Sequence, residues 1–155
     1  MLCGIDAPEI DAESWLNTAT PLSLRGLRGQ VVALHAFQML CPGCVAYGIP
    51  QASTIERLFA GQDVRVIGLH SVFEHHEAMG RTPLEAFVHQ YGLTFPVAID
   101  RPAAQGSIPM TMRAYGLQGT PSLVLIDRAG KIRFSEFGHV EDMRVGATIG
   151  ALLAE

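Results

Sequence analysis

The chain has 155 residues, of which 48% are hydrophobic and 17% charged, and its formal net charge at pH 7 is −4. This length fits a single domain (1–155) that can bury a sizeable core without disulfide cross-links. The mild acidity and the absence of a Lys/Arg cluster argue against a nucleic-acid partner, and no apolar run approaches the roughly 18 residues of a membrane span.

Residues 1–22 are expected to form an irregular N-terminal extension, because Pro8 and Pro21 interrupt regular structure. Trp15 and Leu16 are expected to anchor this extension on the core. The first residues lack a basic stretch followed by an apolar one, so they do not read as a signal peptide. A cytoplasmic location is therefore expected.

The run of apolar and β-branched residues from Val31 to Phe37 predicts a strand that is buried on both faces. After it, apolar residues recur at the spacing of a helix, at Ile49, Ala52, Ile55, Leu58 and Phe59. The motif Cys41-Pro42-Gly43-Cys44 therefore lies where a buried strand is followed by a helix.

The rest of the chain alternates strands and helices and ends in a hairpin and a closing helix. Strands are predicted at 64–69, 95–99, 123–126 and 131–137, and helices at 84–91, 109–115 and 140–153. Residues 127–130, Asp-Arg-Ala-Gly, form a turn that joins two antiparallel strands. This order predicts an α/β fold with a mixed central sheet covered by helices on both faces.

The predicted helix at 84–91 carries recognisable boundary residues. Thr82 is expected at its N-cap, with Pro83 at the first helical position and Glu85 completing a capping box. Gly92 is expected to end the helix.

Cys41 and Cys44 form a C-x-x-C pair in a chain that has one further cysteine, Cys3. Three cysteines do not make a disulfide framework, so the pair indicates redox chemistry or a metal site, and a structural pair is the third alternative. A helix N-terminus favours the reactive thiolate at Cys41, and Cys44 follows one turn later within disulfide reach. Cys44 can then resolve a mixed disulfide formed by Cys41, and Cys3 is expected to take no part.

Gly119-Thr120-Pro121, directly before the hairpin, is the second signal, because an X-Pro bond is where a cis peptide costs least. Together with the CPGC motif after a buried strand and the 127–130 turn, it resembles the thioredoxin superfamily in its redoxin or TlpA-like branch. The resemblance covers essentially the whole chain and extends to Ala7-Pro8-Glu9 and to PLSLRGLRGQVVALHAF.

The resemblance implies a thioredoxin-like fold in which Cys41 is the nucleophile and Cys44 the resolving thiol. It also implies a cis bond before Pro121 and backbone pairing of the substrate with Thr120, next to Pro42 and Gly43 of the motif. The expected activity is thiol–disulfide exchange with protein or small-molecule thiols, by a monomer that needs no cofactor or metal. The alternative for Pro121 is an ordinary trans turn proline.

Three positions depart from the family pattern. Leu40 stands where the family usually has tryptophan, so more aliphatic substrate contacts are expected. Pro50 falls one position later than the family's helix proline, which predicts an inserted residue near Gly48 and a bulged helix. His35 stands where thioredoxins often place a buried carboxylate that handles the proton of the resolving thiol. A neutral imidazole can accept that proton, and the alternative is a core histidine bonded to backbone.

Two other functions stay open. A metal carrier for copper or zinc would combine Cys41 and Cys44 with the nearby histidines His70, His75 and His76. A thiol peroxidase is the other, because the redoxin branch is related to peroxiredoxins. Those enzymes resemble each other in a proline and a hydroxyl residue shortly before the reactive cysteine, where this chain has Leu34 and Gln38.

Overall fold

The computed structural model describes residues 3–155 and contains one six-stranded sheet of order β1-β4-β3-β2-β5-β6. The strands are β1 (Ala12–Leu16), β2 (Val31–Phe37), β3 (Val64–His70), β4 (Val97–Asp100), β5 (Ser122–Ile126) and β6 (Ile132–Phe137). The helices are α1 (Ile49–Leu58), α2 (Arg81–Gln90), α3 (Met110–Ala114) and α4 (Asp142–Leu153). The β2–β3 and β3–β4 pairs are parallel and the other pairs antiparallel, so the sheet is mixed.

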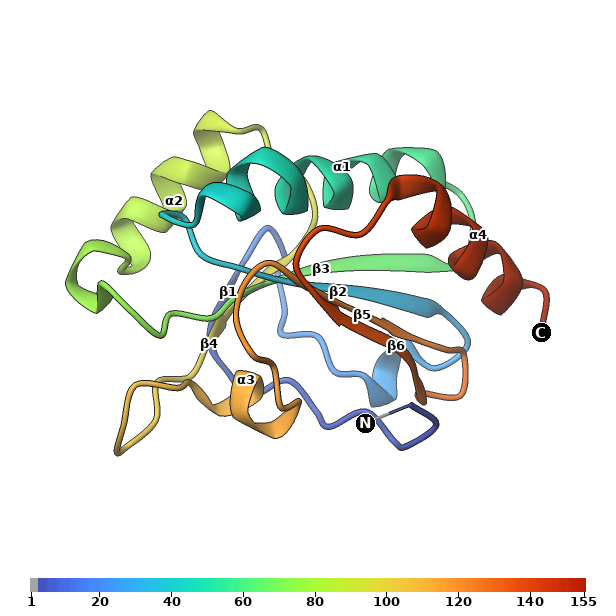
Figure 1. Cartoon of the computed structure of the whole chain (residues 1–155), viewed down its shortest axis with the longest axis horizontal. Helices are drawn as coiled ribbons and strands as arrows, with labels where there is room; N and C mark the ends of the chain where they lie inside the picture. Colours follow the sequence, from blue (N-terminus) through green and yellow to red (C-terminus); the bar gives the residue numbers. More distant parts are fainter. Residues whose placement is uncertain (1–2) are drawn as a thin grey trace.

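Helices lie on both faces of the sheet, as the sequence predicts. Figure 1 shows α1, α2 and α4 together on one face and α3 on the other. The central strand β2 is buried along its whole length, between parallel β3 and antiparallel β5. Because side chains alternate along a strand, Val31, Ala33 and Phe37 join the core under α1, while Val32 and Leu34 join the core on the α3 side.

The prediction that residues 1–22 are irregular is wrong at Ala12–Leu16, which form the edge strand β1. This strand pairs antiparallel with β4, where Trp15 lies opposite Ala98. Trp15 and Leu16 do pack against the core, as expected. The strand is short and has a register shift near its start, and its partner lies far along the chain, so local sequence pattern does not reveal it.

The prediction of a capping box at Thr82 is also wrong. Helix α2 begins at Arg81, its N-cap is Gly80, and no side chain caps it. Glu85 instead pairs with Arg81 at 2.7 Å. Pro83 still lies in the first turn, where its missing N–H leaves no helical hydrogen bond unmade. Gly92 follows the helix with a φ of +62°, as expected of a terminating glycine.

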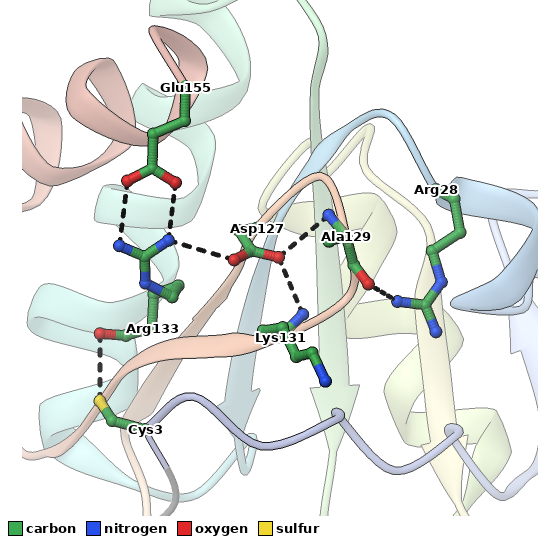
Figure 2. Close-up of polar contacts among 7 residues, drawn as sticks. All are labelled: Cys3, Arg28, Asp127, Ala129, Lys131, Arg133 and Glu155. Carbon is green, nitrogen blue, oxygen red and sulfur yellow. Dashed lines mark hydrogen bonds and ion pairs between the residues drawn. The ribbon is translucent and has the colours of Figure 1, made fainter.

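The predicted hairpin turn joins β5 to β6 and holds segments from both ends of the chain. The Asp127 carboxylate accepts hydrogen bonds from two N–H groups of its own turn, those of Ala129 and Lys131. Arg133 bridges Asp127 and Glu155, and the Cys3 thiol donates to the Arg133 carbonyl at 3.1 Å (Figure 2). Cys3 therefore lies against β6. Within residues 3–155, no helix has the length and apolar character needed to cross a membrane.

Candidate active site

Cys41 lies at the start of the helix that follows β2. Its N–H donates to the Gln38 carbonyl at 3.2 Å, and its own carbonyl accepts from the Val45 N–H at 3.1 Å. The Sγ atom of Cys41 accepts a hydrogen bond from the Cys44 N–H at 3.2 Å, the place that an N-cap oxygen usually fills. A thiolate accepts such a bond more strongly than a thiol, because the bond is then charge-assisted.

The two cysteines of the C-x-x-C pair differ in exposure. Both are free thiols, but Cys41 is half-buried and Cys44 is fully buried. Burial, together with the neighbouring Cys41, raises the pKa of the Cys44 thiol to about 12, although the Gln38 backbone and the Thr120 hydroxyl act in the opposite sense. Cys44 is therefore protonated at neutral pH and must lose a proton before it can react.

The peptide bond between Thr120 and Pro121 is cis, as the resemblance implies. The Thr120 carbonyl accepts a hydrogen bond from the Cys41 thiol at 3.4 Å. The Pro121 ring is buried against the helix that follows Cys41. A Cβ atom added to Gly43 would lie 3.3 Å from the Cδ atom of Pro121, and one added to Gly48 would lie 3.0 Å from the Cβ atom of Pro121. These distances explain glycine at both positions. They also place Gly43 against the proline, while Pro42 is exposed beside Cys41.

The helix after Cys41 is bulged, which confirms the expectation drawn from Pro50. Residues Cys44–Gly48 form a π-helical turn, in which the Ile49 N–H bonds to the Cys44 carbonyl. In an unbroken α-helix, Pro50 would collide with the carbonyl four residues earlier and leave it without a donor. The wider turn takes up the extra residue directly after Cys44.

His35 lies on the face of β2 that α1 covers, and only 3% of its surface is exposed. Its Nε2 lies 3.1 Å from Oε1 of Gln51, whereas its buried Nδ1 finds no hydrogen-bond partner among the described residues. A Cβ on Gly48 would lie 3.7 Å from Nδ1, so this nitrogen sits beneath the π turn. Burial lowers the pKa of His35 to about 4, which keeps the ring neutral. The partner is thus a side chain, not the backbone contact considered as the alternative.

The residues of the metal alternative do not form one site: His70 and His76 line a common pocket, but neither Cys41 nor Cys44 lines it. His70 is buried and accepts a hydrogen bond from the Met39 N–H at 3.3 Å, while His75 and His76 are exposed. The Nε2 atom of His76 lies 3.3 Å from the Ser107 carbonyl oxygen. Among residues 3–155, no three His, Cys, Asp or Glu side chains are placed to share a metal ion.

Exposed apolar side chains lie on the segments next to the dithiol and next to the cis-proline loop. Leu40 directly precedes Cys41 and is 58% exposed. The Tyr47 ring, on the π turn, lies 4.5 Å from the His139 ring, centroid to centroid. Phe137 is exposed at the end of β6. Its ring lies close to Gly119, since a Cβ atom added to Gly119 would be 2.9 Å from the ring. We call Leu40, Tyr47 and Phe137 the apolar rim.

Comparison with known families agrees with this geometry, since the model of the family described as Redoxin matches residues 4–148. The chain belongs to the redoxin family. Among solved structures, this redoxin is 51% identical to a thioredoxin-like superfamily protein, with a TM-score of 0.94 and 97% of each chain covered. It is 49% identical to a thiol-disulfide isomerase from Corynebacterium glutamicum, with a TM-score of 0.91 and coverage of 96% of this chain and 97% of that one.

Among curated relatives, this redoxin is 28% identical over 112 residues to the thiol-disulfide oxidoreductase ResA of Geobacillus thermodenitrificans, which covers 71% of the chain and 56% of ResA. The chain spans between 12% and 56% of the length of the curated relatives it matches. These comparisons confirm the family and fold expected from the sequence, and they support the class of thiol–disulfide oxidoreductase.

Gln38 also belongs to the site of this redoxin, although the sequence analysis noted it only as a departure from the peroxiredoxin pattern. The buried amide of Gln38 donates to the Thr120 hydroxyl at 3.3 Å and accepts from the Phe73 N–H at 3.1 Å. It thereby joins the segment before Cys41 to the loops that follow β3 and precede β5. In the sequence, the only indication of this role is that a polar residue stands between a buried strand and the dithiol. The partners of Gln38 are distant in sequence, so they could not be predicted from the local pattern.

Proposed function

We propose that this redoxin exchanges disulfides through Cys41 and Cys44, with Cys41 attacking first. The observation that carries the proposal is the asymmetry of the pair: Cys41 is accessible at the helix N-terminus, whereas Cys44 is fully buried. The Cys44 N–H, 3.2 Å from Cys41 Sγ, stabilises negative charge on the nucleophile. An accessible thiolate with a protected partner thiol is the arrangement that thiol–disulfide exchange requires.

The exchange has two steps. The Cys41 thiolate attacks one sulfur of the substrate disulfide, which forms a mixed disulfide and releases the first substrate thiolate. Cys44 then loses its proton and attacks Cys41 Sγ, which forms the Cys41–Cys44 disulfide and releases the second substrate thiolate. The released thiolates take up protons. The substrate disulfide is reduced by two electrons, and the protein dithiol is oxidised by two.

The proton of Cys44 needs an acceptor, and we assign this role to His35. The ring is neutral, it lies on the same side of the sheet as Cys44, and its unpartnered Nδ1 lies under the π turn that Cys44 begins. Pro121 lies close to Gly43, directly before that turn, and to Gly48 at its end, and the His35 ring also lies beside Gly48. We therefore place the imidazole and the Cys44 thiol on the inner side of the same turn. Because burial disfavours the charged ring, the imidazolium is short-lived, and it passes its proton to the released substrate thiolate.

The substrate is a protein or small molecule that carries a disulfide or thiol, and it binds over the cis-proline loop. Thr120 offers its backbone beside Cys41, while Pro121 and Gly43 form the floor beneath it and Pro42 lies exposed at its side. The apolar rim supplies aliphatic and aromatic contacts around the reacting sulfurs. These contacts replace the single tryptophan expected before the first cysteine in relatives.

The test is steady-state reduction of a protein disulfide by Cys41→Ser, Cys44→Ser and Cys3→Ser variants. Cys41→Ser should lose turnover because the attacking sulfur is gone. Cys44→Ser should react once and stop as a mixed disulfide. Cys3→Ser is the matched control and should keep wild-type turnover, because Cys3 lies against β6. Wild-type turnover in Cys41→Ser would refute the proposal.

A further inference from the structure

Gln51, in the first turns of α1, joins β2 to the start of α4 through its buried amide. Its Nε2 donates to the Val140 carbonyl at 2.7 Å and to Oδ1 of Asp142 at 2.9 Å. A carbonyl and a carboxylate can only accept, so the atom between them must be the amide nitrogen. The orientation of the Gln51 amide is therefore fixed by α4, with Oε1 directed at His35.

This orientation determines which nitrogen of His35 carries the hydrogen. Oε1 of Gln51 accepts only, so the His35 Nε2 at 3.1 Å must be the donor. In a neutral imidazole the other nitrogen then keeps its lone pair. That nitrogen is Nδ1, the buried atom without a partner among the described residues, 3.7 Å from where a Cβ of Gly48 would lie.

We propose that Gln51 is a positioning residue that holds His35 as the Nε2–H tautomer and so leaves Nδ1 free to accept the Cys44 proton. The inference rests on the proposed function. With the opposite tautomer, the Nε2 lone pair would face the carbonyl oxygen of Gln51, and Nδ1–H would have no acceptor role. The Val140 carbonyl and Asp142, at the start of α4, thereby determine which ring nitrogen of His35 carries the hydrogen.

The surroundings of His35 leave few other groups to set its protonation. Its neighbours in the sheet are Gly68 on β3 and Leu123 on β5, neither of which is charged. The π turn over His35 carries the Cys44 thiol and the Tyr47 phenol, with Cys41 shortly before it, and from α4 the carboxylate of Asp142 acts through Gln51. The amide of Gln51 is thus the contact that distinguishes the two ring nitrogens.

The tautomer can be observed directly by proton–nitrogen correlation NMR of the reduced protein with ¹⁵N-labelled histidine, at neutral pH. We expect a protonated Nε2 and an unprotonated Nδ1 for His35 in the wild type. In Gln51→Leu, the signature should change to a mixture of tautomers or to Nδ1–H. A wild-type protein with Nδ1–H, or an unchanged signature in Gln51→Leu, would overturn the proposal whatever the enzyme activity.

The kinetic consequence is confined to the second step. The assay uses the small aromatic disulfide dithiobis(nitrobenzoate) and a Cys3→Ser background. Attack by Cys41 releases one coloured nitrothiobenzoate thiolate, and resolution by Cys44 releases the second. A base contributes about 10²–10⁴-fold to the step it serves, so loss of its positioning in Gln51→Leu should slow resolution by about tenfold and alter its pH profile. The first release should keep its wild-type rate.

Ile55→Val, one turn further along α1, is the control for lost packing, because it removes a buried methyl group and no polar contact. It should keep the wild-type resolution rate. Equal slowing in Ile55→Val and Gln51→Leu, or an unchanged rate in Gln51→Leu, would overturn the positioning role. If the proposed function itself fails, the wild type releases no second thiolate and Cys44→Ser traps no adduct. The NMR signature of the His35 tautomer is measured independently of these results, so the two failures can be distinguished.

Discussion

Two buried histidines should make the protein lose stability in mild acid. Burial lowers the pKa of His35 and of His70 to about 4, from an ordinary value of 6.5. Below pH 6.5 the two histidines bind protons in the unfolded chain but stay neutral in the folded chain, so the free energy of unfolding falls as the pH falls. The loss is complete near pH 4, where the folded histidines also become protonated, and it is absent above 6.5.

The magnitude follows from the two pKa values. At about pH 5 the unfolded histidine is almost fully protonated and the folded one almost neutral, which destabilises the protein by about 2 kcal/mol per histidine relative to about pH 8. The pair should therefore account for about 4 kcal/mol, a large share of the 5–15 kcal/mol that is typical of domains.

The assay is urea unfolding of the reduced protein across this pH range, for the wild type and for His35→Gln, His70→Gln and the double variant. Glutamine keeps a polar side chain that can replace the bond from the Met39 N–H at residue 70. Each single variant should lose about 2 kcal/mol of acid dependence and the double variant about 4 kcal/mol, whatever their stability at pH 8. An acid dependence that is equal in all four proteins would refute the assignment.

Other substitutions test the packing beneath the site. Gly48→Ala should lower the free energy of unfolding by about 1–3 kcal/mol, because its Cβ would press on Pro121. Gly146→Ala, in α4 with open space around it, should raise that free energy by about 0.5–1 kcal/mol, and urea unfolding of both variants checks the contrast. Asp100→Asn should cost about 1–3 kcal/mol in the same assay, because the buried carboxylate accepts the N–H groups of Thr111 and Met112 at the start of α3. An Asp100→Asn variant as stable as the wild type would contradict that capping role.

The parts of the fold that follow from local pattern were predictable. The apolar run of β2, the helix after the dithiol and the hairpin around residues 127–130 all occur as expected. The bulge in the helix was expected because Pro50 falls one position later than the family's helix proline, and the structure shows it as a π turn that accommodates the proline. The local pattern thus located Cys41 and Cys44, and the family resemblance supplied the cis bond before Pro121.

What could not be predicted depends on pairs that are distant in sequence. Strand β1 exists because β4 lies beside it, and the five residues of β1 have no pattern strong enough to show this alone. The roles of Gln38 and Gln51 depend on Phe73, Thr120 and the start of α4. A buried glutamine can bond in many ways, so its function becomes visible only when its partners are placed around it.

The central claim is that Cys41 attacks and Cys44 resolves. Its most direct test is mass spectrometry of peptides from Cys44→Ser protein after reaction with a disulfide substrate, alongside the wild type. The account predicts a substrate adduct on Cys41 that persists in the variant, and a Cys41–Cys44 disulfide with no adduct on Cys41 in the wild type. No adduct on Cys41 in the variant, or an adduct on Cys41 that persists in the wild type, would contradict it.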